Sequence, residues 1–325
     1  MVRYLTEDDV TQLLTTSDAV RLVEEAMKAR AEGRATDVPR VRTRVPDGTL
    51  HVLQASARDL NRIGYKAYYS SPTGTRFHVY LYDMAKGPLD AILEASQLGM
   101  VRTGAASGVA TRYLAREDAS IVAMIGAGKQ AVGQLEAVCE VRNIREVRVW
   151  SRRPETARKF CDALSTRLKV EMKPVETGAE AVRGAHVINV ITKAANPVLL
   201  GEWMEPGQHV NAAGSNSLIR RELDVAAVKR AGYITVDSRN TARNESGDLL
   251  PLAESGLLDW DALTEIGEVI VGRAPRRTSD GQITLYESHG MGIQDLYVAH
   301  HLVEIARNRG IGVDLPIGPE SGIQS

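Results

Sequence analysis

Cysteine is scarce in this sequence, and long apolar runs are missing. Only two cysteines, Cys139 and Cys161, occur among 325 residues, which is too few for a disulfide framework or a zinc site. We therefore expect two buried thiols in a reducing cytoplasm and no bound metal. No apolar run approaches the roughly 18 residues that a membrane span needs. The acidic N-terminal segment, residues 1–9, also differs from the basic and then apolar pattern of a signal peptide.

An excess of charge of either sign is missing as well. Lysine and arginine total 40 and aspartate and glutamate 41, so the net charge is -1. This balance disfavours nucleic-acid binding. An acidic tail, which would indicate a chaperone-like role, does not occur in the sequence either. The motifs G-x-S-x-G and H-E-x-x-H do not occur, nor does a Cys/His cluster. Their absence disfavours a serine hydrolase or a zinc enzyme.

The composition that remains is that of an ordinary globular protein. Hydrophobic residues make up 43% and charged residues 25% of the chain, values that exclude a disordered chain. At roughly 150 residues per domain, the length predicts about two domains. Changes of pattern indicate one domain over residues 1–115 and a second over residues 116–289. Residues from about 290 to 325 are expected to complete the first domain.

The first domain is predicted to be α+β. Two short helices are expected at its start, because Thr6-x-x-Asp9 resembles a capping box and Val20, Val23 and Met27 mark one apolar helical face. Strand patterns then follow one another without intervening helices, which predicts an antiparallel or mixed sheet. These strands are expected at residues 50–53, 65–69, 77–82 and 89–94. A helix rich in small residues is expected over residues 96–114.

The second domain is predicted to be α/β, with a doubly wound parallel sheet of the Rossmann type. Residues 121–125 are all apolar, as is typical of a strand covered on both faces. Helix and strand patterns alternate after it, which indicates a parallel sheet. Further strands are expected at residues 147–150, 170–173, 186–191, 209–213, 233–236 and 283–288. The last helix is expected over residues 294–308, and the tail after Pro316 is expected to be frayed.

A glycine-rich loop provides the clearest functional motif. Residues 126–131 read G-x-G-x-x-A directly after an apolar strand and at the start of a helix, the context that a dinucleotide-binding fingerprint requires. Gly126 permits a tight turn, Gly128 lets the backbone approach a pyrophosphate, and Ala131 allows close helix–strand packing. The helix N-terminus adds N–H groups and a positive dipole end for phosphates. The motif therefore predicts a nicotinamide dinucleotide cofactor.

The end of the next strand distinguishes between the two nicotinamide cofactors. An acidic residue there would bind a ribose 2′-hydroxyl, whereas arginine suits a 2′-phosphate. The chain has Ser151, Arg152 and Arg153 at this place and no carboxylate. We therefore expect NADP(H) to be preferred and NAD(H) to be possible. The alternative is that the two arginines belong to a solvated loop.

Cations outside the nucleotide-binding domain suggest an anionic ligand. Arg40 and Arg42 stand two apart ahead of a strand and so share one face. Lys66 lies in an otherwise apolar and aromatic strand, and Arg102 interrupts the helix of small residues. A buried arginine needs a partner anion, and its guanidinium offers a carboxylate a bidentate fork. Together these cations predict a carboxylate pocket, although each of them taken singly also fits an ordinary surface charge.

Several motifs together resemble the ornithine cyclodeaminase/mu-crystallin family over residues 1–310. They are Leu98–Ser107, the glycine-rich loop, Glu205–Gly214 and Gly292–Asp295, in that order. The resemblance implies a homodimer built through the first domain, a Rossmann domain, and an active site between the two domains. Family members include cyclodeaminases, alanine dehydrogenase, and ketimine or pyrroline-carboxylate reductases. They act on the Cα–N bond of an amino acid with a nicotinamide cofactor.

The resemblance also implies roles for individual residues. Lys66 and Arg102, with either Arg40 or Arg42, would hold the substrate carboxylate, and His289 would lie near the substrate. A packed or solvated histidine is the alternative for His289. The implied cofactor-binding residues are Thr103, Gly126, Gly128, Lys129, Gln130, Ser151, Arg152, Arg153, Thr192, Asn211, Ala212 and Ser288.

One position departs from ornithine cyclodeaminase, in which an aspartate handles the substrate amine and water. The chain has Asn216 there, and an amide cannot act as a general base. We therefore expect an NAD(P)H-dependent imine (ketimine) reductase or amino-acid dehydrogenase that acts at the Cα–N bond of a small amino or imino acid. Lys66 is the expected proton donor or polarising cation, and Arg102 the main carboxylate anchor. The alternatives are a cyclodeaminase-type lyase with NAD as internal redox cofactor, and a non-catalytic NADP-dependent ligand-binding protein.

Overall fold

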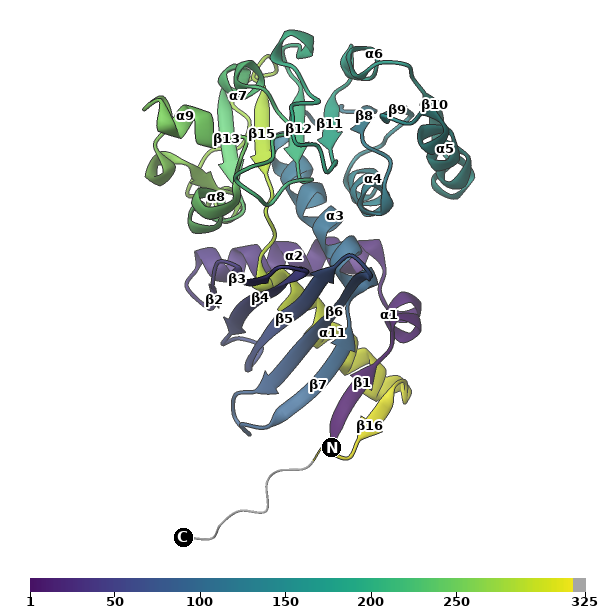
Figure 1. Ribbon diagram of the computed structural model, residues 1–325, viewed down its shortest axis with the longest axis vertical. Helices are drawn as coiled ribbons and strands as arrows, with labels where there is room; N and C mark the ends of the chain where they lie inside the picture. Colours follow the sequence, from purple (N-terminus) through teal and green to yellow (C-terminus); the bar gives the residue numbers. More distant parts are fainter. Residues whose placement is uncertain (318–325) are drawn as a thin grey trace. The chain divides into compact units, whose positions relative to one another are not determined.

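The computed structural model describes residues 1–317, and the chain divides into two compact units (Figure 1). The first unit contains residues 1–102 and the chain from Met291 onward, and the second contains Thr103–Gly290. The division falls after Arg102, inside helix α3 (Ser96–Leu114). The sequence pattern predicts it later, after residue 115. The tail predicted to fray lies, from residue 318 onward, outside the described residues.

The first unit is built on a mixed sheet, as predicted. Its strand order is β16-β1-β7-β6-β5-β4-β2, and β3 also pairs with β4. Strand β1 runs parallel to β7, and the other pairs are antiparallel. The strands are β1 (Val2–Leu5), β2 (Ala35–Asp37), β3 (Val41–Val45), β4 (Gly48–Ala57), β5 (Arg62–Ser71), β6 (Gly74–Asp83), β7 (Leu89–Glu94) and β16 (Val313–Leu315). Arg42 therefore lies inside a strand, so the expectation that it precedes one is wrong.

Helices α1 (Glu7–Leu13), α2 (Thr16–Ala31) and α11 (Gly292–Arg309) complete the first unit. The predicted capping box is present: the Thr6 hydroxyl accepts from the Asp9 N–H at 3.2 Å, and the Asp9 carboxylate accepts from the Thr6 N–H at 2.9 Å. Helix α2 is longer than the short helix expected, because its buried apolar face continues through Met27. Helix α11 packs against α2 and against the central strands β4, β5 and β6.

The second unit is the predicted doubly wound α/β fold. Its sheet has the order β10-β9-β8-β11-β12-β15-β13-β14, and every pair is parallel. The strand order reverses between β8 and β11, the place where such folds bind nucleotides at the carboxyl ends of the strands. The strands are β8 (Ile121–Ile125), β9 (Glu146–Trp150), β10 (Glu171–Pro174), β11 (Val187–Val190), β12 (His209–Ala212), β13 (Tyr233–Val236), β14 (Thr264–Glu265) and β15 (Thr284–Glu287).

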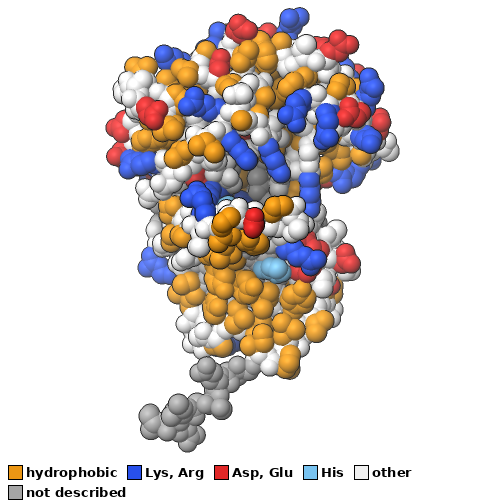
Figure 2. All heavy atoms as spheres, in the orientation of Figure 1, with side chains coloured by type: hydrophobic (Ala, Val, Ile, Leu, Met, Phe, Trp, Pro, Cys, Tyr) orange, Lys and Arg blue, Asp and Glu red, His pale blue; other side chains and the backbone are white. Residues whose placement is uncertain are grey.

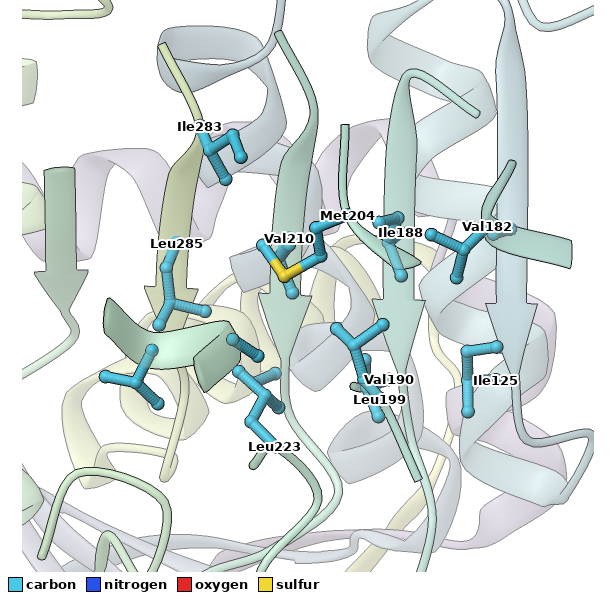
Figure 3. Close-up of a cluster of buried hydrophobic side chains, with 14 of the residues drawn as sticks. Ile125, Val182, Ile188, Val190, Leu199, Met204, Val210, Leu223, Ile283 and Leu285 are labelled. Atoms are coloured by element: carbon cyan, nitrogen blue, oxygen red, sulfur yellow. The ribbon is translucent and has the colours of Figure 1, made fainter. Parts of the chain in front are cut away.

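Helices lie on both faces of this sheet (Figure 1). Residues of β8 alternate between two apolar clusters: Ala123 and Ile125 belong to one, Val122 and Met124 to the other. Figure 3 shows the first cluster, into which Met204 also packs. The all-apolar strand is thus explained by burial on both faces. The helices are α4 (Lys129–Val141), α5 (Pro154–Leu168), α6 (Gly178–Val182), α7 (Val225–Arg230), α8 (Arg239–Glu245), α9 (Leu250–Glu254) and α10 (Ile266–Ile270).

The small residues of α3 serve helix packing in the second unit. A Cβ atom on Gly104 would lie 2.0 Å from the carbonyl oxygen of Gly133 in α4, and one on Gly108 would lie 2.8 Å from the carbonyl oxygen of Ala137. Glycine is therefore required for α3 and α4 to approach this closely.

Both cysteines are free, but only Cys161 is fully buried, so the expectation of two buried thiols is wrong for Cys139. Burial raises the pKa of Cys139 to about 12 and that of Cys161 to about 11, which keeps both thiols neutral. Among the helices of residues 1–317, none has the length and apolar character needed to cross a membrane.

Candidate active site

The glycine-rich loop between β8 and α4 has the geometry of a phosphate cradle. Gly126 has a φ of +113°, and a Cβ atom there would lie 2.4 Å from the carbonyl oxygen of Ile191, so the position requires glycine. At Gly128, by contrast, a Cβ atom would meet no atom within 4 Å. Gly128 caps α4 without a side-chain hydrogen bond. The helix N-terminus is thus open to an anion, which fits a dinucleotide pyrophosphate.

The residues predicted to hold the rest of the nucleotide lie beside this loop. Lys129 and Gln130 are exposed in the first turn of α4. The Gly126 N–H donates to the carbonyl oxygen of Trp150 at 2.9 Å. This bond places the end of β9, and with it the segment Ser151–Arg153, next to the glycine-rich loop. Arg152 and Arg153 are exposed there.

A buried glutamate that the sequence reasoning missed fixes the loops after β11 and β12. The Glu222 carboxylate accepts from the Thr192 N–H at 2.6 Å, from the Thr192 hydroxyl at 2.7 Å and from the Gly214 N–H at 2.6 Å. Burial raises the pKa of Glu222 to about 7 against the effect of these hydrogen bonds. The predicted nicotinamide-side residue Thr192 is therefore held rigidly by a neighbouring segment.

Asn211 differs from the expected cofactor contact. Its side-chain amide donates to Asn189 at 2.8 Å and to Thr111 at 3.0 Å, and its oxygen lies 3.0 Å from a ring nitrogen of His209. These bonds hold the side chain of Asn211, a residue of β12 between β11 and β15, inside the unit and use its hydrogen-bonding groups within the protein. Ala212 is buried and its carbonyl oxygen accepts from the Ser288 N–H at 2.9 Å.

His289 is a packed histidine with two acidic neighbours. Its ring nitrogens lie 3.7 Å from an Asp237 oxygen and 3.4 Å from a Glu287 oxygen. Asp237 also accepts from the backbone N–H groups of His289 and Gly290, at 2.8 and 2.7 Å. Burial would lower the pKa of His289, but the two carboxylates outweigh it and raise the pKa to about 10. His289 is thus an imidazolium at neutral pH.

Lys66 and Arg102 come together in the first unit around one carboxylate. The Lys66 ammonium lies 2.7 Å from Asp295 Oδ2 and 2.8 Å from Oδ1, and Arg102 Nε donates to Asp295 Oδ1 at 2.9 Å. Lys66, Arg102 and Asp295 are 3%, 5% and 1% exposed. Arg102 Nη1 also donates to the Gln294 side-chain oxygen at 2.9 Å. Two buried cations therefore share a single anion.

The environment of Lys66 lowers the pKa of its side chain well below that of an ordinary lysine. Burial lowers its pKa most, Arg102 lowers it further, and Asp295 opposes both, with a resulting pKa of about 7. Arg40 is also among the charges that lower this pKa. The sequence predicts that a buried Arg102 needs an anion, but it does not identify Asp295 as that anion. The G-I-Q-D segment was the available signal, although it does not reveal which residue Asp295 meets.

The two early arginines occupy different positions along the sheet. Arg42 lies opposite His51, and His51 opposite Tyr68, whereas Lys66 lies opposite Leu53. Arg42 is the charge that most strongly lowers the pKa of His51, after burial. Asn216, the position that departs from ornithine cyclodeaminase, is exposed in the loop after β12.

Comparison with known proteins identifies the family. The model of the ornithine cyclodeaminase/mu-crystallin family matches residues 2–310. The chain belongs to this family. A relative from Bacillus cereus, Delta(1)-pyrroline-2-carboxylate reductase, is 38% identical over 235 residues, which cover 72% of each chain.

Solved structures of family members share the whole fold. One is the Thermococcus litoralis Delta(1)-pyrroline-2-carboxylate reductase in complex with NADH and L-proline, with a TM-score of 0.92, 33% identity, and coverage of 97% of this chain and 100% of that one. Another is an archaeal alanine dehydrogenase dimer with bound NAD, with a TM-score of 0.92, 31% identity, and coverage of 98% and 99%. The family assignment thus agrees with the resemblance found from the motifs.

Proposed function

We propose that this family member is an NAD(P)H-dependent imine reductase or amino-acid dehydrogenase that acts at the Cα–N bond of a small amino or imino acid. The observation that carries the proposal is the buried group of Lys66, Arg102 and Asp295. Two cations around one carboxylate leave a positive charge for a substrate carboxylate, since a buried charge is stable only with a partner. The glycine-rich loop supplies the matching cofactor site, and named relatives carry out reductions of this kind.

Individual side chains have separate roles in the proposed reduction. Arg102 anchors the substrate carboxylate, and one of the two early arginines, Arg40 or Arg42, is the second anchor. When bound, a reduced nicotinamide supplies the hydride that adds to the imine carbon. Lys66 gives a proton to the imine nitrogen, so that C=N becomes CH–NH. A pKa of about 7 suits this role at neutral pH.

Cofactor preference follows from the segment after β9. We infer that Arg152 and Arg153 favour NADP(H), because both are exposed beside the glycine-rich loop. A charge-assisted hydrogen bond contributes about 1.5–3 kcal/mol, a preference of roughly 10- to 100-fold. Arg152→Asp should abolish or reverse this preference in kcat/KM. Equal efficiency with NADPH and NADH in the unmodified protein would contradict the inference.

A homodimer is also proposed, built on the sheet face opposite α11. That face exposes apolar side chains, and Figure 2 shows them gathered over the first unit. A groove of about 690 Å³ there is lined in part by Val38, Val52, Ile63 and Tyr65. A second copy of the chain is the occupant that fits, because exposed apolar patches of this kind mark interfaces and a related structure is a dimer. Light scattering should show a dimer, and Ile63→Glu should give a monomer.

Cofactor consumption tests the reaction. The protein is incubated with NADPH and a panel of cyclic and acyclic 2-imino acids, and in parallel with ornithine and catalytic NAD⁺. We expect at least one imine to consume NADPH stoichiometrically and ornithine to give negligible proline, since Asn216 cannot serve as a base. Rapid proline formation without net NADH would overturn the proposal in favour of a lyase. If the protein turns over none of the imines, the remaining interpretation is a non-catalytic ligand-binding protein.

A further inference from the structure

Gln294 is a buried residue that contacts Arg102 through only one end of its side-chain amide. Arg102 Nη1 donates to the Gln294 side-chain oxygen at 2.9 Å. The amide nitrogen, Nε2, is buried and has no hydrogen-bond partner within residues 1–317. A buried donor without a partner is destabilising. Hydrogen bonding of the whole amide therefore does not explain a glutamine at this position, and the bond to Arg102 is what the side chain provides.

Capping of helix α11 does not account for Gln294 either. It is the third residue of the helix, where a glutamine commonly accepts from the backbone N–H of the residue that precedes the helix. In this chain Asp37, at the end of β2, contributes to the cap instead, because it accepts from the Ile293 N–H at 3.0 Å. The Gln294 oxygen is thus directed to Arg102 and not to the helix N-terminus.

Two successive residues of α11 hold the Arg102 guanidinium at two of its three nitrogens. Nε donates to Asp295 Oδ1 and Nη1 donates to Gln294, both at 2.9 Å. Nη2 makes no hydrogen bond within the part of the chain that the structure describes. Because a guanidinium is planar and rigid, two bonds also fix the direction of its third nitrogen. Nη2 is therefore the nitrogen that can donate to a ligand.

The two partners of Arg102 differ in charge. Asp295 is an anion that Arg102 shares with Lys66, whereas the Gln294 amide is neutral. Two cations and one anion leave a single positive charge, which one substrate carboxylate would neutralise. A glutamate at position 294 would have nearly the same shape and would add a second anion in contact with Arg102. The amide thus supplies a hydrogen-bond acceptor without removing the positive charge.

We propose that Gln294 is a positioning residue for substrate binding: its oxygen orients Arg102, and its neutral amide preserves the charge that attracts the substrate carboxylate. The inference rests on the proposed function, which takes Arg102 as the carboxylate anchor. Gln294 acts through Arg102 and not on the reacting atoms, so its loss should weaken substrate binding and leave the hydride and proton transfers nearly unchanged. A purely structural glutamine would affect stability alone.

Two substitutions separate the orientation of Arg102 from its charge balance. Gln294→Met removes the acceptor, so KM for the imine with the highest turnover should rise about 10-fold with NADPH, while kcat changes by less than about 2-fold. Gln294→Glu keeps the acceptor and adds an anion, so KM should rise about 100-fold or more. Gln208→Met is the control, because the oxygen and the nitrogen of this buried amide are both hydrogen-bonded. It should lower the Tm and leave KM unchanged.

A binding measurement without turnover separates Gln294 from the reaction. Pyrrole-2-carboxylate, an aromatic ring without a reducible imine, should raise the Tm of the unmodified protein more than pyrrole-2-carboxamide does. Gln294→Met should reduce this difference, and Gln294→Glu should remove it. An unchanged difference and an unchanged KM in Gln294→Met would overturn the inference and leave the proposed function standing. Equal Tm shifts in the unmodified protein, with no imine turnover, would overturn both. A loss of kcat in Gln294→Met at unchanged KM would also contradict the positioning role.

Discussion

Buried charge is organised in opposite ways in the two units of this protein. In the first unit, Lys66 and Arg102 share the single carboxylate of Asp295, so positive charge is in excess. In the second unit, the Glu222 carboxylate accepts three hydrogen bonds from Thr192 and Gly214. The first arrangement has two cations for one anion, whereas the second has a hydrogen-bond donor for each position that the carboxylate uses. The contrast distinguishes buried charges that can bind a ligand from buried charges that stabilise the fold.

A second buried acid, Asp248, extends the hydrogen-bond network of Glu222 in the second unit. Asp248 accepts from the N–H groups of Glu222 and Leu223, at 2.6 and 2.8 Å, and so continues the chain of acids and backbone donors. Burial raises the pKa of Asp248 to about 8. Backbone donors saturate these acids, and a saturated buried network rigidifies the structure around it. This network fixes the loops that follow β11 and β12.

Loss of Lys66 should have the largest effect. Lys66→Met removes the proposed proton donor, and kcat should fall by about 10²- to 10⁴-fold. Circular dichroism should show a folded protein, because methionine fills the same buried space. Lys86→Met, at a lysine whose side chain is 77% exposed, is the control. Near-normal turnover by Lys66→Met would remove Lys66 from the mechanism.

Loss of Asp295 should have an intermediate effect with a distinct pH signature. Asp295 raises the pKa of Lys66 against burial and Arg102, so Asp295→Asn should lower that pKa below about 7. A proton donor must be protonated, so activity is lost as pH rises through its pKa. The alkaline limb of the kcat profile should therefore move to lower pH, by about one unit or more, with a loss of about 10-fold at pH 8. A uniform loss at every pH would indicate a merely structural role, and Asp8→Asn, at an exposed aspartate, is the control.

Loss of the Glu222 carboxyl group should have the smallest effect, chiefly on the pH dependence of stability. The folded-state pKa of about 7 lies above the ordinary value of 4.5, so this group's contribution to stability is complete below about 4.5 and is lost as pH rises through about 7. Glu222→Gln should therefore reduce the fall in unfolding free energy between pH 5 and pH 8 by about 1–3 kcal/mol.

Tryptophan fluorescence during urea unfolding measures this change, because Trp150, Trp203 and Trp260 all lie in the second unit. Glu171→Gln, at an exposed glutamate of β10, is the control. An unchanged pH dependence in Glu222→Gln would contradict the assignment of Glu222 to the scaffold.

Local patterns sufficed for much of the fold and part of the site. The apolar run at β8 and the G-x-G-x-x-A loop are contiguous signals, and α3 has the bounds that its small residues predicted. Asp295 was missed because it meets Lys66 across 229 positions of sequence, which no local pattern encodes. Glu222 was missed for the same reason. Strand β3 is short and carries arginines, so its alternation did not identify it as a strand.

The carboxylate requirement tests the central claim most directly. The imine that gives the highest turnover is compared with its carboxamide, which has nearly the same shape and no charge, in kcat/KM with NADPH. The excess positive charge at Lys66 and Arg102 predicts at least about a 100-fold preference for the carboxylate, since a buried cation without its partner is strongly unfavourable. Equal kcat/KM for the two compounds would contradict the account.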